Sequence, residues 1–353
     1  MFKKSLMLLV GAVVLFGATG CIQITSTTEK ATSQAGIFVS KDFGETWVNS
    51  SSLMTPGATV GTIAAAETLM MEFDPVDEKA IYIGTRKDGM FFSYNNGIGW
   101  NQGLTVGVPR AIAIDPTAHC TIYAAVDSWL KKTTDCSRKW DKVYYTGDDA
   151  RSVTAVTLDL KSPKTLWVGL STGEILKSPD AGKSWSKKTT LKSRIAKILI
   201  SGFDSKVIYA ASLENGISKS TDAGETWQSL NSAFTSLGTN EIYYYRGFIE
   251  DGKKAGTLYY ASAVGLFKTT TNGQEWTAMN LLTPSDQANI YSIAVDPNNS
   301  NNLYYGTTTS FYRSKDGGNS WIAKKMPTTL AASVLKVHPK IGSILYMGVK
   351  SIK

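Results

Sequence analysis

The chain has 353 residues, of which 42% are hydrophobic and 10% aromatic, a composition that excludes a disordered chain and favours strands over helices. Its formal net charge of +8 is spread along the chain without a Lys/Arg block of the kind that binds nucleic acid. Only two histidines are present, His119 and His338, so we expect no His-ligated metal, no cofactor and no His-dependent catalytic triad.

Residues 1–20 have the pattern of a secretory signal. Lys3 and Lys4 precede an apolar run from Leu6 to Phe16, and small residues follow up to Gly20. An apolar run of about 11 residues is too short to span a membrane, which takes about 20. Removal of this segment lowers the net charge to +6, because it carries two lysines and no acidic residue. We therefore predict an exported protein.

Cys21 follows Ala18-Thr19-Gly20, a junction that resembles the bacterial lipobox. In that motif the cysteine becomes the lipidated first residue of the mature chain, which implies an anchor on the extracytoplasmic face of a bacterial membrane. Ordinary signal cleavage nearby, releasing a soluble protein, is the alternative. Residues 21–35 are then the lipidated cysteine and a flexible tether, because residues 22–34 are rich in Ser and Thr.

From residue 36 onward one motif, Ser-x-Asp-x-Gly-x-x-Trp, recurs with an average period of about 46 residues, and we call it the box. Its Asp can accept backbone N–H groups of a turn, its Gly permits a positive φ, and its Trp can pack between repeats. We expect a structural role for the third box position. Four boxes are intact and three are degraded, with these residues at the third position: Asp42, Asn95, Asp135, Asp180, Asp222, Thr271 and Asp316.

Each period also contains two apolar strands. The chain starts with a box that no strand precedes and ends with strands that no box follows, at 334–338 and 344–349. We predict an all-β fold, a seven-bladed β-propeller of four-stranded blades over residues 36–353, whose last blade is closed by N-terminal and C-terminal strands. The first strand of each blade is expected at 71–75, 111–116, 155–159, 197–201, 247–251, 293–297 and 334–339.

The boxes resemble the Asp-box (BNR) repeats of sialidases, xyloglucanase-type glycosidases, sortilin-type receptors and the photosystem II assembly factor of cyanobacteria and chloroplasts. These families share a fold and differ in function. The assembly factor is the most similar in design, with one seven-bladed propeller, export, a lipid anchor in cyanobacteria and an arginine-rich patch on one face.

Arginines precede or begin the first strands of four consecutive blades. First strands line the central channel, so these side chains should converge at its mouth on the face opposite the boxes, where guanidinium groups can bind carboxylates or phosphates. Solvated arginines with local partners are the alternative. The proposed partner-binding residues are Arg110, Arg151, Arg194 and Arg246, with Tyr245, Tyr291 and Glu241 at the rim.

Two smaller features complete the sequence. Cys120 and Cys136 fall at turns of one blade, so they can form a disulfide in an oxidising compartment, and two buried thiols are the alternative. A basic residue precedes the Ser or Thr of five boxes, and we expect a solvated position at the outer strand for each: Lys132, Lys177, Lys219, Lys268 and Arg313.

We therefore predict a monomeric, non-catalytic, lipid-anchored scaffold whose arginine-lined mouth binds a membrane or envelope protein. The alternative is a carbohydrate-active enzyme or glycan-binding module, for which Glu241 beside Tyr243 and Tyr244 would supply sialidase-type parts. Against it stand the missing Arg-Ile-Pro signature of sialidases and the missing second propeller of xyloglucanases. A propeller that only spaces other envelope components is a third interpretation.

Overall fold

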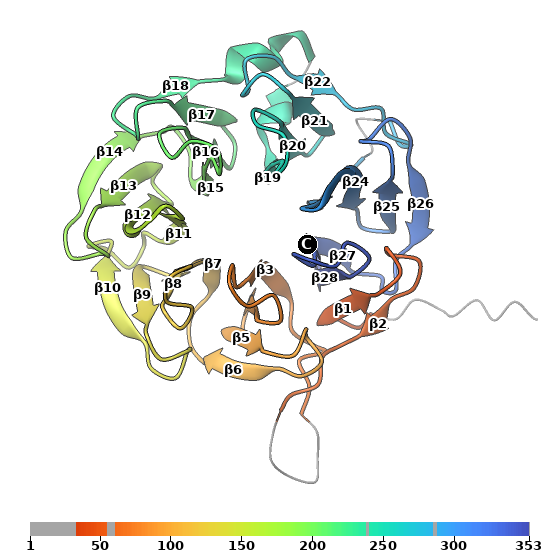
Figure 1. Cartoon of the computed structure of the whole chain (residues 1–353), viewed down its shortest axis with the longest axis horizontal. Coiled ribbons are helices and arrows are strands. Elements are labelled where there is room, and N and C mark those ends of the chain that lie inside the picture. The colour runs from red at the N-terminus through yellow and green to blue at the C-terminus, as the bar shows by residue number, and fades with distance from the viewer. Residues whose placement is uncertain (1–32, 55–60, 238–239, 285–287, 353) are drawn as a thin grey trace, which may run out of the picture. The chain divides into compact units, whose positions relative to one another are not determined.

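The computed structural model describes residues 33–54, 61–237, 240–284 and 288–352. Residues 31–353 form one compact unit. Within it, seven four-stranded antiparallel sheets stand around a common centre (Figure 1). The chain is therefore an all-β seven-bladed propeller, as predicted. The signal segment and Cys21 lie outside the described residues, and among those described no helix is long and apolar enough to cross a membrane.

Six blades are contiguous in sequence, and their strands follow one another from the centre to the rim (Figure 1). Blade 1 contains β3 (Thr68–Phe73), β4 (Ile81–Thr85), β5 (Met90–Ser93) and β6 (Asn101–Leu104). Blade 2 contains β7 (Pro109–Ile114), β8 (Ile122–Val126), β9 (Trp129–Thr133) and β10 (Asp141–Tyr145). Blade 3 contains β11 (Val153–Asp159), β12 (Ser162–Leu170), β13 (Glu174–Ser178) and β14 (Ser186–Thr190).

The second half of the ring repeats this order. Blade 4 contains β15 (Ile195–Ile200), β16 (Ile208–Ser212), β17 (Ile217–Ser220) and β18 (Gln228–Ser229). The 3-10 helices η1 (Asn231–Leu237) and η2 (Asn240–Tyr243) lead to blade 5, with β19 (Tyr245–Glu250), β20 (Leu258–Ser262), β21 (Leu266–Thr269) and β22 (Thr277–Ala278). Blade 6 contains β23 (Ser292–Asp296), β24 (Asn299–Gly306), β25 (Ser310–Ser314) and β26 (Ile322–Lys325).

Blade 7 joins the two ends of the chain. Its order from the rim inward is β2 (Val48–Asn49), β1 (Ile37–Ser40), β28 (Leu345–Lys350) and β27 (Ala331–Val337). β1 pairs antiparallel with β28, with Ile37 opposite Gly348 and Ser40 opposite Leu345. This closure is the one predicted, and it leaves β28 without a free edge.

The second strands supply most of the largest fully buried side chains. β4, β8, β16 and β20 are buried at every position. Each blade packs against a neighbour on both faces, so these strands are continuous apolar runs instead of alternating ones. Their tyrosines also reach the box of the next blade: the hydroxyl of Tyr123 donates to the carbonyl of Ala181, and that of Tyr346 to the carbonyl of Asn96.

Each box is a hydrogen-bonded turn between the third and fourth strands. In blade 3 the Asp180 carboxylate accepts from Ser178 Oγ (2.8 Å), Ser184 N (2.8 Å) and Ser184 Oγ (2.6 Å). Two successive residues have positive φ, Ala181 at 62° and Gly182 at 93°. The degraded box of blade 2 keeps this backbone, since Ser137 stands in the glycine position with φ 72°.

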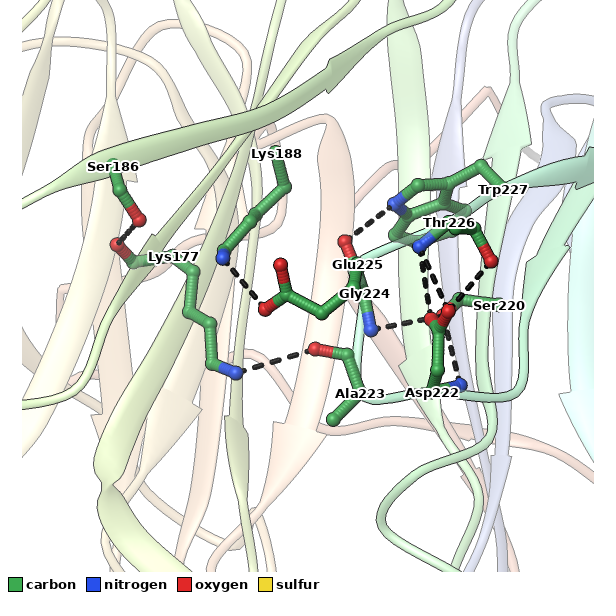
Figure 2. A network of polar contacts seen from close by, with 10 residues as sticks. All are labelled: Lys177, Ser186, Lys188, Ser220, Asp222, Ala223, Gly224, Glu225, Thr226 and Trp227. Atoms are coloured by element: carbon green, nitrogen blue, oxygen red, sulfur yellow. Dashed lines mark hydrogen bonds and ion pairs between the residues drawn. The ribbon is translucent and has the colours of Figure 1, made fainter.

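The basic residues before five boxes are not freely solvated, so that prediction was wrong. Each stands over an aromatic ring, with the cation 4.6–5.7 Å from the ring centroid. Lys177 also donates to the carbonyl of Ala223 in the box of the next blade, at 3.2 Å (Figure 2). Arg313 is 6% exposed. Lys177, Lys219 and Arg313 also contact the box of the next blade and so link neighbouring blades.

The first strands begin earlier than expected in all seven blades. Their register shifts near the start in six blades, for example between Pro109 and Ala111 and between Tyr245 and Gly247. A bulge adds one residue and breaks the side-chain alternation, which hides the start of the strand from periodicity. Arg110, Tyr245 and Arg246 therefore lie inside strands and not in loops.

Cys120 and Cys136 are joined in a disulfide. Cys120 lies in the turn between β7 and β8, and Cys136 lies in the box of blade 2. The bond links two turns on the same face of one blade.

Candidate functional site

The two faces of the ring differ in what the strands bring to them. First strands run from one face to the other, and third strands run in the same direction, so each box lies where a first strand ends. The beginnings of the first strands consequently lie on the face opposite the boxes. Arg110 and Arg246 occupy the second position of β7 and β19, and Arg194 directly precedes β15.

Arg110 and Arg194 are brought together at this end of the channel. Each is half-buried, and the Nε atom of each is buried without a hydrogen-bond partner among the described residues. Burial and the nearby charge of Arg110 lower the pKa of Arg194. Two guanidinium groups that repel each other and lack a described carboxylate partner form a site suited to an anion.

The other proposed residues have different surroundings. Arg246 is exposed, with its guanidinium 5.4 Å from the centroid of the Tyr291 ring. Arg151 is exposed and pairs with Asp148 at 3.8 Å, so it has a local partner. Tyr245 begins β19, and burial with the nearby Glu72 charge raises the pKa of its phenol. Glu241 falls in η2, and its side chain is outside the described residues.

Two basic residues on this face were not among the predicted site residues. Arg86 follows the last residue of β4, and Lys350 is the last residue of β28. Burial and the charges of Arg86 and Arg246 lower the pKa of Lys350. Second strands return to the face where first strands begin. A basic residue at the end of a second strand could therefore have been predicted to lie on this face.

Glu67 is the acidic counterpart within this group. Its carboxylate pairs with Arg86 Nε at 2.7 Å and accepts hydrogen bonds from the backbone and hydroxyl of Ser351. It is therefore already engaged. We call the following group the cationic mouth: Arg86, Arg110, Arg194, Arg246 and Lys350.

Potential metal ligands do not cluster among the described residues. Within these ranges, no group of three or more His, Cys, Asp or Glu side chains could hold a metal ion. His338 is buried, and its Nδ1 accepts from the backbone N–H groups of Lys340 and Ile341, both at 3.1 Å. That histidine closes the turn between β27 and β28.

Comparison with known proteins supports the fold. Neither a family model nor a curated protein matches the sequence. Among solved structures, a GH74 enzyme from Niastella koreensis superposes with a TM-score of 0.63 at 18% identity, over 80% of this chain and 51% of that chain. The present chain thus spans about half the length of that enzyme.

The match with this chain extends over nearly the whole length of two further solved structures. YCF48 from Cyanidioschyzon merolae superposes with a TM-score of 0.62 at 11% identity, over 84% of this chain and 98% of that chain. YCF48 bound to a D1 peptide gives a TM-score of 0.59 at 14% identity, over 81% of this chain and 94% of that chain. At these identities the similarity is one of fold, and it agrees with the resemblance to single-propeller assembly factors and to glycosidase propellers.

Proposed function

We propose that this protein is a non-catalytic propeller scaffold that binds an acidic or carboxylate-terminated segment of another protein at the cationic mouth. The observation that carries the proposal is the pair Arg110 and Arg194, whose Nε atoms are buried without described partners. A carboxylate placed between them would accept charge-assisted hydrogen bonds and relieve their mutual repulsion.

The setting of the site supports a peptide partner. The five basic side chains of the cationic mouth belong to the face where the first strands begin, Glu67 is already engaged by Arg86, and the Tyr291 ring lies against Arg246. YCF48, which has the same fold, is known in complex with a D1 peptide. A photosystem II assembly-like role is the specific form of the proposal, with export and lipidation at Cys21 placing the mouth at a membrane surface.

A glycan ligand or glycosidase activity is the second candidate, favoured by the similarity to GH74 propellers. Glycoside hydrolysis needs two carboxylic groups flanking the scissile bond. In the cationic mouth Glu67 is bound to Arg86 and Ser351. The mouth is therefore better suited to binding an anion than to cleaving a neutral sugar.

The test is peptide binding to the full-length chain in detergent, followed by fluorescence anisotropy. The probes are a glutamate-rich peptide with a free C-terminal carboxylate, its C-terminal amide, and a neutral peptide of equal length. We expect the double variant Arg110→Gln/Arg194→Gln to lose about tenfold or more in affinity for the acidic peptides. Weaker binding of the amide than of the free acid would identify a terminal carboxylate as the ligand.

The matched control is Arg138→Gln, because Arg138 is exposed in the box of blade 2 on the opposite face. It should bind like the wild type. Equal binding by the wild type and the double variant would contradict the proposal. Turnover of a fluorogenic sialoside or a β-glucan by the wild type would favour the second candidate instead.

A further inference from the structure

A second charged group lies inside the channel, away from the cationic mouth. Glu72 of β3 pairs with Lys336 of β27 at 2.7 Å and with Lys197 of β15 at 3.8 Å. These three side chains come from blades 1, 7 and 4, so they meet across the centre of the ring. Two ammonium groups therefore share one carboxylate.

The two ammonium groups lie at different distances from the Glu72 carboxylate. Lys336 is within hydrogen-bond distance of Glu72, whereas the distance from Lys197 is too long for a normal hydrogen bond. Glu72 is the one ion-pair partner of Lys197 among the described residues. This group of three side chains thus holds one positive charge in excess, and of its two ammonium groups Lys197 is the one farther from the carboxylate.

A cavity of about 250 Å³ opens next to Lys197 and Glu72. Its other walls include Ile112, Val156 and Leu158, and it extends toward the turns that follow β11 and β15. Those turns lie on the box face, so the cavity is at the opposite end of the channel from the cationic mouth. The inner end of the cavity carries the Lys197 ammonium beside the Glu72 carboxylate, and its walls include aliphatic side chains.

The polar groups near the opening of the cavity already have partners. Ser201 Oγ donates to Glu250 at 2.7 Å, Ser205 Oγ donates to Asp159 at 2.9 Å, and Lys161 Nζ donates to the carbonyl of Phe203 at 3.1 Å. Lys161 is exposed at this opening, so Lys197 is the cation that lies at the inner end of the cavity.

We infer that this cavity binds a small aliphatic carboxylate, with the carboxylate on the Lys197 ammonium and the hydrocarbon tail against Ile112, Val156 and Leu158. Such a ligand balances the excess charge and buries apolar surface at the same time. The volume is just below the range of about 300–1,000 Å³ that is usual for ligand pockets, which limits the tail to a short or medium chain. This site is independent of the function proposed for the mouth.

Calorimetric titration of the full-length chain with hexanoate tests the inference. We expect saturable binding with a dissociation constant on the order of 1 mM, a scale that suits a ligand of this size. Acetate has the charge without the tail and hexanol has the tail without the charge, so both should bind at least about tenfold more weakly.

Substitutions of Lys197 test whether hexanoate binds in this cavity. Lys197→Met should weaken hexanoate binding by about tenfold or more, whereas Lys197→Arg should largely retain it. Lys192→Met is the matched control, because Lys192 is exposed in the loop before β15, and the mouth variant Arg110→Gln/Arg194→Gln should also bind hexanoate normally. Urea unfolding confirms that each variant is folded. Absence of saturable hexanoate binding, or equal affinities for wild type and Lys197→Met, would overturn the inference.

Discussion

At the scale of single residues, the box Asp is held by hydrogen bonds that favour its charged form. Hydrogen bonds from the Ser184 hydroxyl and backbone N–H lower the pKa of Asp180 to about 2, and similar contacts lower the pKa of Asp316 to about 2. Asn95, at the same position in the box of blade 1, shows which of these hydrogen bonds form without a negative charge. Its Oδ1 still accepts from Ser93 Oγ (2.7 Å) and Gly99 N (2.9 Å). The neutral amide, however, lacks the second oxygen and the negative charge of a carboxylate.

The lowered pKa gives the box a pH dependence. A carboxylate whose folded-state pKa lies below its unfolded value of 3.8 stabilises the fold above about pH 4, and this stabilisation is lost as the pH falls toward 2. We expect Asp180→Asn to lower the urea midpoint at pH 7 and to have little effect near pH 2. Urea unfolding at both pH values measures it. The reverse variant Asn95→Asp should show the opposite sign at pH 7, and an equal loss at both pH values for Asp180→Asn would contradict the account.

At the scale of elements, junctions between blades depend on the residue three positions after each box Trp. In blades 3 and 6 this residue is a lysine that pairs with a box glutamate of the next blade: Lys188 with Glu225 at 2.7 Å (Figure 2) and Lys324 with Glu45 at 2.5 Å. In blade 4 it is Leu230, which packs close to the box glycine of blade 5. The same contact is thus made by charge in some junctions and by apolar packing in others.

The junction between blades 6 and 7 contains the most buried of these cations. The Arg313 guanidinium lies 4.6 Å from the centroid of the Phe43 ring and 3.4 Å from Glu45. We expect Arg313→Ala to cost about 2 kcal/mol of unfolding free energy, because it removes packing and a partly desolvated cation–π contact. Chemical denaturation measures this cost. Lys132→Ala, at the same register in blade 2 but less buried, is the control and should cost less than about 1 kcal/mol; equal costs would show that burial of the cation is irrelevant.

At the scale of the whole molecule, the ring is held shut by pairing between its two ends. β1 is buried at all four positions, and its backbone pairs with β28 on one side and β2 on the other. Without β1, the buried strand β28 would present an unpaired edge to solvent.

Removal of residues 33–50 from the chain should therefore open the ring. We expect the truncated chain to aggregate or to lose its cooperative unfolding transition, because blade 7 would keep only β27 and β28. Size-exclusion chromatography and thermal unfolding test this. Adding the peptide 33–50 in trans is the control, since it can restore the pairing. A monomeric truncated chain with an unchanged transition would show that closure is not required.

The sequence by itself determined the number of blades, the position of each box and the closure by both termini. These features are local or periodic. A box specifies its own turn through contacts within eight residues, and a box without preceding strands at the start of the chain implies that the strands at the end complete its blade. The placement of Arg110, Arg194 and Arg246 on the face opposite the boxes was also predictable, because it depends only on strand direction.

Tertiary structure alone decided which charges are compensated. Arg151 finds Asp148 nearby in sequence, whereas Arg110 of blade 2 and Arg194 beside blade 4 lie close enough for the charge of one to lower the pKa of the other. Lys197 meets Glu72 across the channel, a contact between residues more than a hundred positions apart. Such pairings depend on the distances between blades around the ring and on bulges that redirect individual side chains, and neither quantity is encoded in the local pattern of the chain.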